Sequence, residues 1–139
     1  MNNTRIEPYL NFNGNCREAM EFYQKIFGGK LDISTFGEFN KEMPEDQKNG
    51  VMHSTLTSDG LTFMASDGMP GKKVVFGDSV NMSIAGQDET KLTELFNGLA
   101  DGGSVIIPLA KQVWGDTFGM LTDKFGIHWL VNISAAKTA

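Results

Sequence analysis

The residues best suited to chemistry lie near the end of the chain, in the stretch TDKFGIHWLVN at positions 122–132. The stretch predicts a tight turn over residues 123–126 and then a strand whose side chains alternate between two faces. The faces carry different side chains, with Ile127, Trp129 and Val131 on one and His128, Leu130 and Asn132 on the other. An imidazole and an amide can bind a metal ion or orient a substrate, but the alkyl group of Leu130 between them can do neither.

The other of the two histidines, His53, lies in a predicted strand over residues 51–57, where it shares a face with Thr55. Neither histidine has an acidic partner at a spacing typical of a catalytic triad, and no serine stands in a G-x-S-x-G nucleophile turn. Two interpretations of the histidines follow. Either they bind a metal ion, or each is a hydrogen-bonding residue in the wall of a mixed polar and apolar pocket.

The composition is that of an acidic globular protein. Its 139 residues, 40% hydrophobic and 21% charged, predict a single domain over residues 1–139. A net charge of −5 with scattered Lys and Arg argues against nucleic-acid binding. No apolar run approaches the roughly 20 residues that span a bilayer, and the first residues lack the apolar segment of a signal peptide. Cys16 is the only cysteine, so no intrachain disulfide can form and we expect a cytoplasmic protein.

The first half of the chain predicts a strand, a helix and three further strands. Alternation favours a strand over residues 6–12, and Asn15 with Glu18 predicts a capping box for a helix that ends at Gly28. Further strands are predicted over residues 30–39, 51–57 and 61–67, with a polar loop over 40–50 and a hairpin turn over 58–60. The apolar stripe of the helix comprises Ala19, Phe22, Tyr23, Ile26 and Phe27.

The same order of elements returns after a loop rich in Gly, Pro and Lys over residues 68–79. A strand that begins at Val80 precedes a helix that Asp88 caps and Gly102 ends. A shift of 66 residues lays Phe63 on Trp129, and a shift of 73 lays the first helix stripe on Leu92, Leu95, Phe96 and Leu99. The chain therefore predicts two βαβββ modules, about residues 4–67 and 79–134, each leaving one sheet face uncovered by its own helix.

Three segments occur in order across nearly the whole chain: PYLNFNGNCREAMEFYQKIFGG, FMASDGMPGKK and WGDTFGMLTDKFGIHWLVNI. They resemble the PhnB-like branch of the vicinal oxygen chelate superfamily of glyoxalases, extradiol dioxygenases and antibiotic-resistance proteins. The resemblance implies an α+β fold in which two βαβββ modules form a cupped, mixed, mostly antiparallel sheet, and it implies a homodimer. Members of the branch often carry the description of a 3-demethylubiquinone-9 3-methyltransferase domain. No glycine-rich loop stands between a predicted strand and helix here, as a nucleotide-derived methyl donor would need.

In metal-using relatives, the resemblance implies two ligands from each module, one near the start of its first strand and one on its fourth. The corresponding positions here are Glu7, Met64, Asn81 and Leu130. A catalytic divalent ion typically needs about three hard or borderline protein ligands. One carboxylate with an amide, a thioether and an alkyl group does not supply them. We therefore expect no superfamily metal site and no cofactor.

Other side chains on the predicted inner faces suit a bound molecule. Tyr9 and Asn11 face the cup together with Glu7, and they offer a hydroxyl and an amide. Trp114 either stacks on a planar ligand at the mouth of the cup or completes the core. The lysine pair at 72–73 either closes over an anionic ligand or remains solvated in its loop.

Three functions follow as hypotheses. The first is a metal-independent small-molecule binding protein for a partly apolar, planar ligand, with no nucleic-acid or membrane partner. Its pocket would be lined by Glu7, Tyr9, Asn11, His53, Thr55, Met64, Asn81, Trp114, His128 and Leu130. The alternative is a metal-dependent lyase, isomerase or dioxygenase whose ligands have moved to His53, His128 and Glu7. The third is the methyltransferase of the family's description, for which the sequence offers no cofactor-binding feature.

Overall fold

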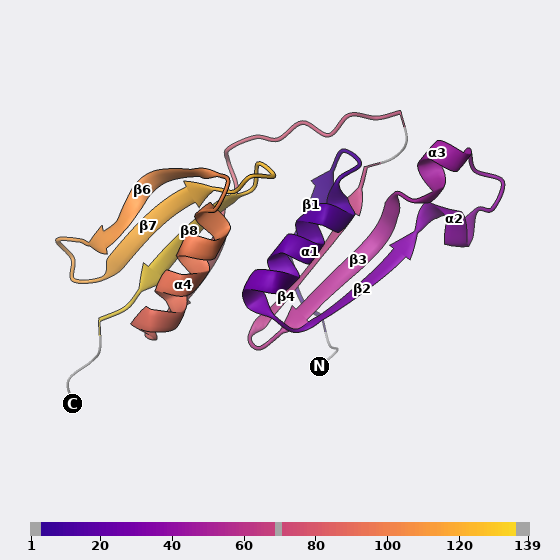
Figure 1. The fold of residues 1–139 in the computed structure, drawn as a ribbon. Coiled ribbons are helices and arrows are strands. Elements are labelled where there is room, and N and C mark those ends of the chain that lie inside the picture. The colour runs from indigo at the N-terminus through magenta and orange to yellow at the C-terminus, as the bar shows by residue number, and fades with distance from the viewer. Residues whose placement is uncertain (1–3, 69–70, 136–139) are drawn as a thin grey trace. The chain divides into compact units, whose positions relative to one another are not determined.

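The computed structural model of the chain describes residues 4–68 and 71–135, which fall into two compact units, Met1–Val75 and Phe76–Ala139 (Figure 1). The first unit contains β1 (Tyr9–Phe12), α1 (Cys16–Phe27), β2 (Lys30–Thr35), α2 (Phe36–Phe39), α3 (Glu45–Lys48), β3 (Val51–Ser58) and β4 (Leu61–Asp67). The second contains β5 (Met82–Gly86), α4 (Glu89–Ala100), β6 (Ser104–Lys111), β7 (Thr117–Thr122) and β8 (His128–Ile133). That the two units together form one domain stays a prediction.

Each unit contains one four-stranded mixed sheet with the same topology. The strand order is β1-β4-β3-β2 in the first sheet and β5-β8-β7-β6 in the second. The pairs β1–β4 and β5–β8 are parallel, and the other pairs are antiparallel. The predicted α+β class with two βαβββ modules and mostly antiparallel sheets is therefore confirmed.

In the first unit, α1 covers one face of the sheet and leaves the other open. The rings of Tyr23 and Phe27 meet the ring of Phe63 edge-on, with centroids 5.7 and 6.4 Å apart. Leu56 on β3 and Phe63 on β4 are fully buried beneath this helix, and Phe12 on β1 is fully buried as well. Because successive side chains of a strand point to opposite faces, the neighbours of these residues point to the open face.

The second unit repeats this layering with α4. All four residues of its predicted apolar stripe are buried, and so are Trp129 and Val131 on β8. Gly119 on β7 lies directly under the helix, where a Cβ would come within 2.8 Å of the Phe96 ring and 2.9 Å of the Leu109 backbone. A glycine is therefore required there for the helix and β6 to pack.

Two predicted strands begin too early. Ile6 is fully exposed, and β1 begins at Tyr9, because Pro8 has no N–H to donate and its carbonyl accepts the last ladder bond from Met64. Val80 is 76% exposed, and β5 begins at Met82, the residue that pairs with Trp129 near the start of β8.

Three further expectations for the first unit are wrong. The strand predicted over residues 30–39 ends at Thr35, where a bulge and a hydrogen bond from the Phe36 N–H to the Gly50 carbonyl turn the chain into α2. The polar loop predicted over 40–50 contains the short helix α3. Asn15 makes no side-chain cap bond to α1, so the predicted capping box does not form. In the second unit the cap at Asp88 is confirmed, since its carboxylate accepts the Lys91 N–H at 3.0 Å.

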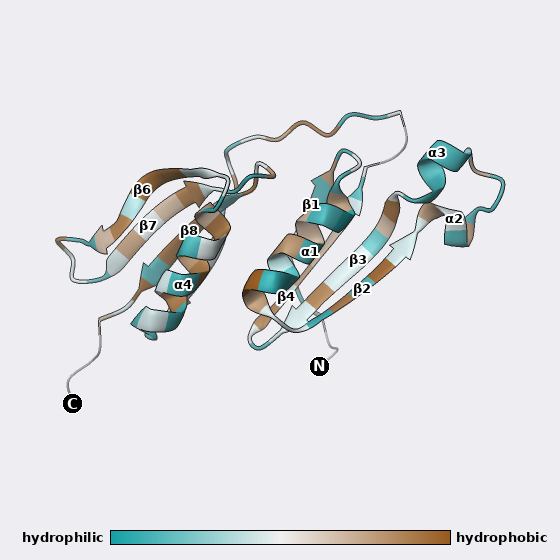
Figure 2. Cartoon of the chain, viewed as in Figure 1, coloured by the Kyte–Doolittle hydropathy of each residue, from teal (hydrophilic) through white to brown (hydrophobic). Residues whose placement is uncertain are grey.

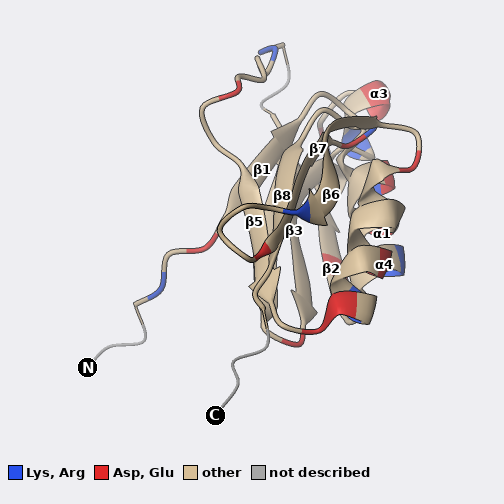
Figure 3. Ribbon diagram, turned by 90° about the vertical axis from the view of Figure 1, so that its left-hand side faces the viewer, with Lys and Arg blue, Asp and Glu red and all other residues tan. Residues whose placement is uncertain are grey.

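Hydropathy and charge follow this layering. In Figure 2, α3 is hydrophilic along its length and β6 is mostly hydrophobic. In Figure 3, charged residues lie mainly on the helices and connecting segments, and most of the strand length is uncharged. Among the described residues, no helix is long and apolar enough to cross a membrane.

Candidate functional site

The open face of the first sheet carries a hydrogen-bonded row of three side chains. The Tyr9 hydroxyl lies 3.1 Å from His53 Nδ1, and the Thr55 hydroxyl lies 3.2 Å from His53 Nε2. A neutral imidazole donates through one nitrogen and accepts through the other, so one hydroxyl donates to His53 and the other accepts from it. Both ring nitrogens therefore have a partner, and the row fixes the imidazole plane. The structure brings Tyr9, His53 and Thr55 together as the sequence predicted.

Met64 lies in the middle of this face. It pairs with Tyr9 on β1 and with Thr55 on β3, and it is half-buried. Asn11 lies one pair further along β1, where its side-chain oxygen accepts a hydrogen bond of 3.4 Å from the Ser66 hydroxyl. The face thus offers an apolar centre with hydroxyl, imidazole and amide groups around it.

The open face of the second sheet has a similar arrangement with different chemistry. His128 Nδ1 lies 2.8 Å from the Thr122 hydroxyl, and His128 Nε2 lies 3.0 Å from the Gly77 carbonyl. A carbonyl only accepts, so Nε2 donates to Gly77, and in a neutral imidazole Nδ1 then accepts from Thr122. Leu130 follows on the same face and pairs with Ser83 and Met120. The position of Leu130 in the second sheet is therefore equivalent to that of Met64 in the first.

Asn132 and Trp114 of this unit each contact a neighbouring side chain. Asn132 Nδ2 donates to an Asp116 carboxylate oxygen at 3.1 Å, which ties β8 to the segment before β7. Trp114 lies in the turn between β6 and β7, 61% exposed, with its ring centroid 6.2 Å from that of Phe118 in an edge contact. Trp114 does not complete the core, and its role in ligand binding stays a prediction.

The four positions at which metal-using relatives place their ligands do not fit a divalent ion here. Glu7 lies 3.7 Å from the Arg5 guanidinium, and Met64 and Leu130 offer a thioether and an alkyl group. Asn81 precedes β5 and offers a neutral amide. In the described parts of the chain, no group of three or more His, Cys, Asp or Glu side chains could hold a metal ion. The alternative set of His53, His128 and Glu7 stays a prediction.

Sequence reasoning missed two buried carboxylates. Asp67, at the end of β4, accepts the N–H groups of Gly14 and Cys16 through Oδ1 at 2.8 and 2.9 Å and that of Val51 through Oδ2 at 2.9 Å. Asp123 accepts from the Trp129 indole at 2.8 Å. A charged residue directly at the end of an apolar strand was the available signal, and both positions have it.

The thiol of Cys16 is fully buried beside Ser54, with Sγ 3.7 Å from its hydroxyl oxygen. Burial raises the pKa of the Cys16 thiol to about 12, although the Ser54 hydroxyl acts in the opposite direction. A thiol with such a pKa is almost wholly protonated at neutral pH and is a poor nucleophile. The surroundings of Cys16 therefore suit a structural residue rather than a nucleophile.

The two open-faced βαβββ units define the class of protein as α+β with the glyoxalase/bleomycin-resistance fold. A glyoxalase/bleomycin resistance protein/dioxygenase family enzyme from Burkholderia phytofirmans shares this fold, with a TM-score of 0.57 at 13% identity over 90% of this chain and 95% of that one. This likeness concerns the fold alone.

Within this fold class, the sequence identifies a narrower family. The sequence profile of the family described as 3-demethylubiquinone-9 3-methyltransferase matches residues 4–132, and the chain belongs to this family. Protein PA1353 from Pseudomonas aeruginosa is 39% identical, with a TM-score of 0.84 over 96% of this chain and 99% of that one. The PhnB protein from Bacillus cereus is 27% identical, with a TM-score of 0.78 over 94% and 100% of the two chains. The predicted PhnB-like resemblance is confirmed.

Proposed function

We propose that this chain binds a small organic molecule on the open faces of its sheets, through hydrogen bonds and apolar contacts and without a metal ion. The observation that carries the proposal is the pair of side chains at the centres of these faces. Met64 and Leu130 are half-buried, and neither offers a hard ligand. Half-buried apolar side chains suit contact with a partly apolar ligand.

The polar groups around Met64 would orient that ligand. Tyr9 is 43% exposed, and its hydroxyl is held by His53. Because the row is hydrogen-bonded without a ligand, ordering its side chains on binding costs less free energy than ordering free ones. Asn11 adds an amide that lies exposed on the same face.

The metal-dependent alternative has less support from these contacts. Each ring nitrogen of His53 and His128 already has a partner, so a metal ion would have to displace a hydroxyl group or, at His128 Nε2, the Gly77 carbonyl. The carboxylate of Glu7 already lies beside Arg5. A metal ion at these residues would therefore first break existing interactions.

The methyl transfer named in the family's description also has less support. A nucleotide-derived methyl donor is typically bound by a glycine-rich turn between a strand and a helix. The turn from β1 to α1 consists of residues 13–15, with Gly14 as its one glycine, and the turn from β5 to α4 consists of Gln87 and Asp88. Neither turn has the glycine spacing of such a site.

A measurement of bound metal tests the proposal directly. Protein purified without chelator should contain well under one equivalent of Zn, Ni, Mn or Fe by elemental analysis. EDTA should leave its melting temperature unchanged, because a specifically bound ion would stabilise the folded state by mass action. A stoichiometric ion whose removal lowers the melting temperature would favour the lyase, isomerase or dioxygenase alternative.

A fragment screen tests the site itself. Binders found by thermal shift should move the backbone amide NMR signals of Tyr9, His53 and Met64. Tyr9→Phe removes only the hydroxyl and should lower the affinity of those binders several-fold, which corresponds to the loss of about one hydrogen bond. The control is Thr93→Val on α4, on the helix side of the second sheet. Binders that move no open-face signal, or that respond equally to both variants, would contradict the proposal.

We further propose a homodimer in the cytoplasm, as the resemblance and the single buried cysteine suggest. Light scattering coupled to size-exclusion chromatography should give twice the chain mass of 15.2 kDa. A mass equal to that of one chain across the micromolar range would contradict the dimer.

A further inference from the structure

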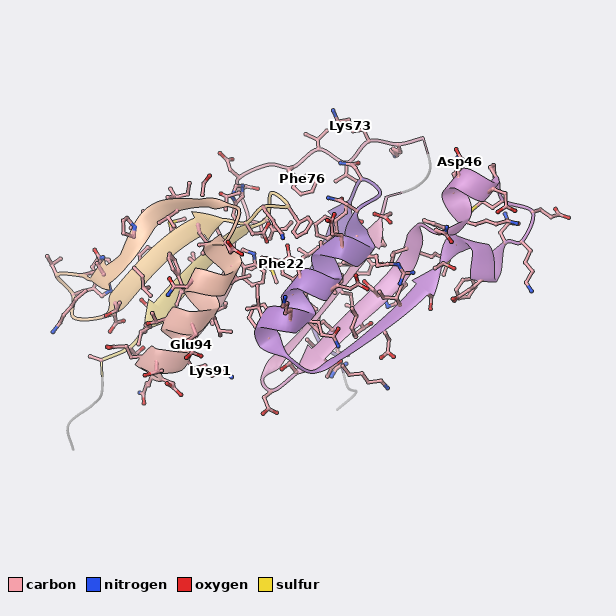
Figure 4. All side chains as sticks on the ribbon, viewed as in Figure 1. Phe22, Asp46, Lys73, Phe76, Lys91 and Glu94 are labelled. Atoms are coloured by element: carbon pink, nitrogen blue, oxygen red, sulfur yellow. The ribbon has the colours of Figure 1, made fainter. Side chains whose placement is uncertain are left out.

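A cavity of about 560 Å³ lies in the first unit, at the end of the sheet where β1 and β4 stop. Its walls come from the turn after β1, from α2 and α3, and from residues 71–73, which lie beyond β4. Figure 4 labels two of its lining residues, Asp46 on α3 and Lys73 beyond β4. The volume falls within the roughly 300–1,000 Å³ of typical small-molecule sites.

This cavity is separate from the open face of the sheet. Phe12 lines the cavity and is fully buried on the side of β1 that faces α1. Tyr9 and Asn11 alternate with it and lie on the opposite, open face. Among the described residues, the cavity shares none with the row of Tyr9, His53 and Thr55. A molecule bound here would therefore leave the open face free.

Much of the cavity wall is aromatic ring and bare backbone. Gly50 packs its backbone against the Phe36 ring, since a Cβ there would lie 3.0 Å from a ring carbon. A Cβ on Gly14 would meet nothing within 4 Å, so open space extends up to the backbone at that position. Aromatic rings and glycine backbone allow close approach of a flat apolar group.

The charged residues at the cavity differ in whether they have a partner. The Asp67 carboxylate already accepts three backbone N–H groups. Lys72 and Lys73 are exposed, and in the described parts of the chain neither has an acidic partner. Two adjacent unpaired cations create a local positive potential that attracts anions.

The lysines are held at the cavity by an anchored backbone. Asn13, in the turn after β1, donates through Nδ2 to the Val74 carbonyl at 3.0 Å and accepts the Val74 N–H through Oδ1 at 2.7 Å. This pair of hydrogen bonds fixes the residue that follows Lys73 to the end of β1. Binding an anion would therefore order the two side chains but not the backbone that carries them.

We propose that this cavity binds a small organic anion with a flat apolar body. The anionic group, a carboxylate or a sulfonate, pairs with Lys72 and Lys73, and the apolar body lies against Phe36. Asp46 stands exposed on the wall formed by α3. It repels a second anionic group, so the site favours monoanions with charge at one end only.

The probe for this site is 8-anilinonaphthalene-1-sulfonate, which has a fused ring and one sulfonate. Titrated into the full chain, it should move the amide NMR signals of Phe36, Gly50 and Gly68 saturably. The double variant Lys72→Gln/Lys73→Gln should weaken its binding about fivefold, as the loss of two exposed ion pairs does. N-phenyl-1-naphthylamine, the same skeleton without the sulfonate, should bind the natural chain and the double variant equally.

Two further variants make the result specific. Lys91→Gln/Lys111→Gln removes the same charge from exposed lysines of the second unit and should leave the affinity unchanged. Gln47→Trp fills the cavity from α3 and should abolish binding. If that variant fails to fold, the lysine variants still decide. Equal weakening by both lysine pairs, shifts confined to Tyr9, His53 and Met64, or no binding at millimolar probe would each overturn the proposal. The outcomes of the lysine variants do not depend on whether the open face binds a ligand.

Discussion

Asp123 and Trp129 are joined inside the second unit by a hydrogen bond of 2.8 Å from the indole N–H to Oδ2. The other carboxylate oxygen accepts the N–H groups of Phe125 and Ile127 at 2.8 and 3.1 Å, which closes the turn before β8. Charge-assisted bonds of this kind are about twice as strong as neutral ones. The turn thus positions the core tryptophan, and this leaves His128 and Leu130 on the open face. In this stretch, the Asp123 carboxylate therefore serves folding rather than chemistry.

The buried thiol of Cys16 makes the free energy of unfolding fall at alkaline pH. Burial raises its pKa from 9.0 to about 12 in the folded chain, so above pH 9 the unfolded chain loses this proton first. The stability is therefore full below pH 9 and is lost as the pH rises toward 12. Between pH 8 and pH 10.5, the natural chain should lose about 2 kcal/mol more unfolding free energy than Cys16→Ala. Urea unfolding at the two pH values measures the difference.

Both chains contain the same tyrosines and lysines, so the contribution of these residues to the pH dependence cancels when the two profiles are compared. Cys16→Ala should itself be less stable by about 1 kcal/mol at pH 8, because it leaves a small cavity. Parallel pH profiles for the two chains would show that the Cys16 thiol ionises as readily in the folded chain as in the unfolded one.

At the scale of elements, the two long helices begin in different ways. α4 is capped from its own sequence by Asp88. α1 has no side-chain cap from Asn15, and Asp67 on β4 accepts the Cys16 N–H instead. A carboxylate at a helix N-terminus satisfies an unpaired donor and interacts favourably with the helix dipole. The start of α1 is therefore tied to the sheet rather than to the chain that precedes it.

This difference predicts unequal effects of two similar substitutions. Asp88→Ala should lower the unfolding free energy by about 1 kcal/mol, as the loss of a side-chain cap does. Asn15→Ala should cost less than about 0.5 kcal/mol, since Asn15 makes no cap bond to lose. Urea unfolding at pH 7 compares the two. An equal cost would mean that Asn15 caps α1 in solution.

Most elements were predictable because their apolar periodicity is long and regular. The limits of β3 and β4 and the stripe of α4 follow from the sequence alone. For α1, the sequence indicated Phe22 as part of the buried stripe, but Cys16 and Met20 are buried and Phe22 is only half-buried. A large aromatic side chain at the edge of the buried helix face can still reach the sheet. The apolar stripe in the sequence is therefore wider than the set of fully buried residues.

For the candidate site, the sequence predicted only which side chains share a face of a strand. Alternation placed Tyr9, His53 and Thr55 on one open face, and the structure shows the hydrogen bonds that join them. The partner of His128 Nε2, the Gly77 carbonyl, lies 51 residues away in a loop. A contact of that kind depends on the path of irregular backbone, for which no periodicity gives a signal. The cavity beside Lys72 is also formed largely by irregular backbone, so the sequence did not predict it.

At the scale of the whole molecule, the duplication is visible in register as well as in sequence. Tyr9 pairs with Met64 in the first sheet as Ser83 pairs with Leu130 in the second. Each unit buries its own aromatic residue beneath its helix, Phe63 in one and Trp129 in the other. A sheet with one helix still exposes its other face, which in each unit carries polar side chains around one apolar centre. The repeated unit therefore supplies two related open surfaces whose chemistry differs.

The equivalence of Phe63 and Trp129 makes a prediction for the full chain. Phe63→Ala and Trp129→Ala should each cost about 3–5 kcal/mol, because both remove a large ring from a packed core. Phe39→Ala, at a ring that is 66% exposed, should cost less than about 0.5 kcal/mol. If the chain is one domain, each core variant should still unfold in a single transition, so that amide NMR signals of both units disappear together in urea. Signals lost in only the mutated unit would show two independent domains, and a cost below about 1 kcal/mol at Trp129 would contradict its place in the core.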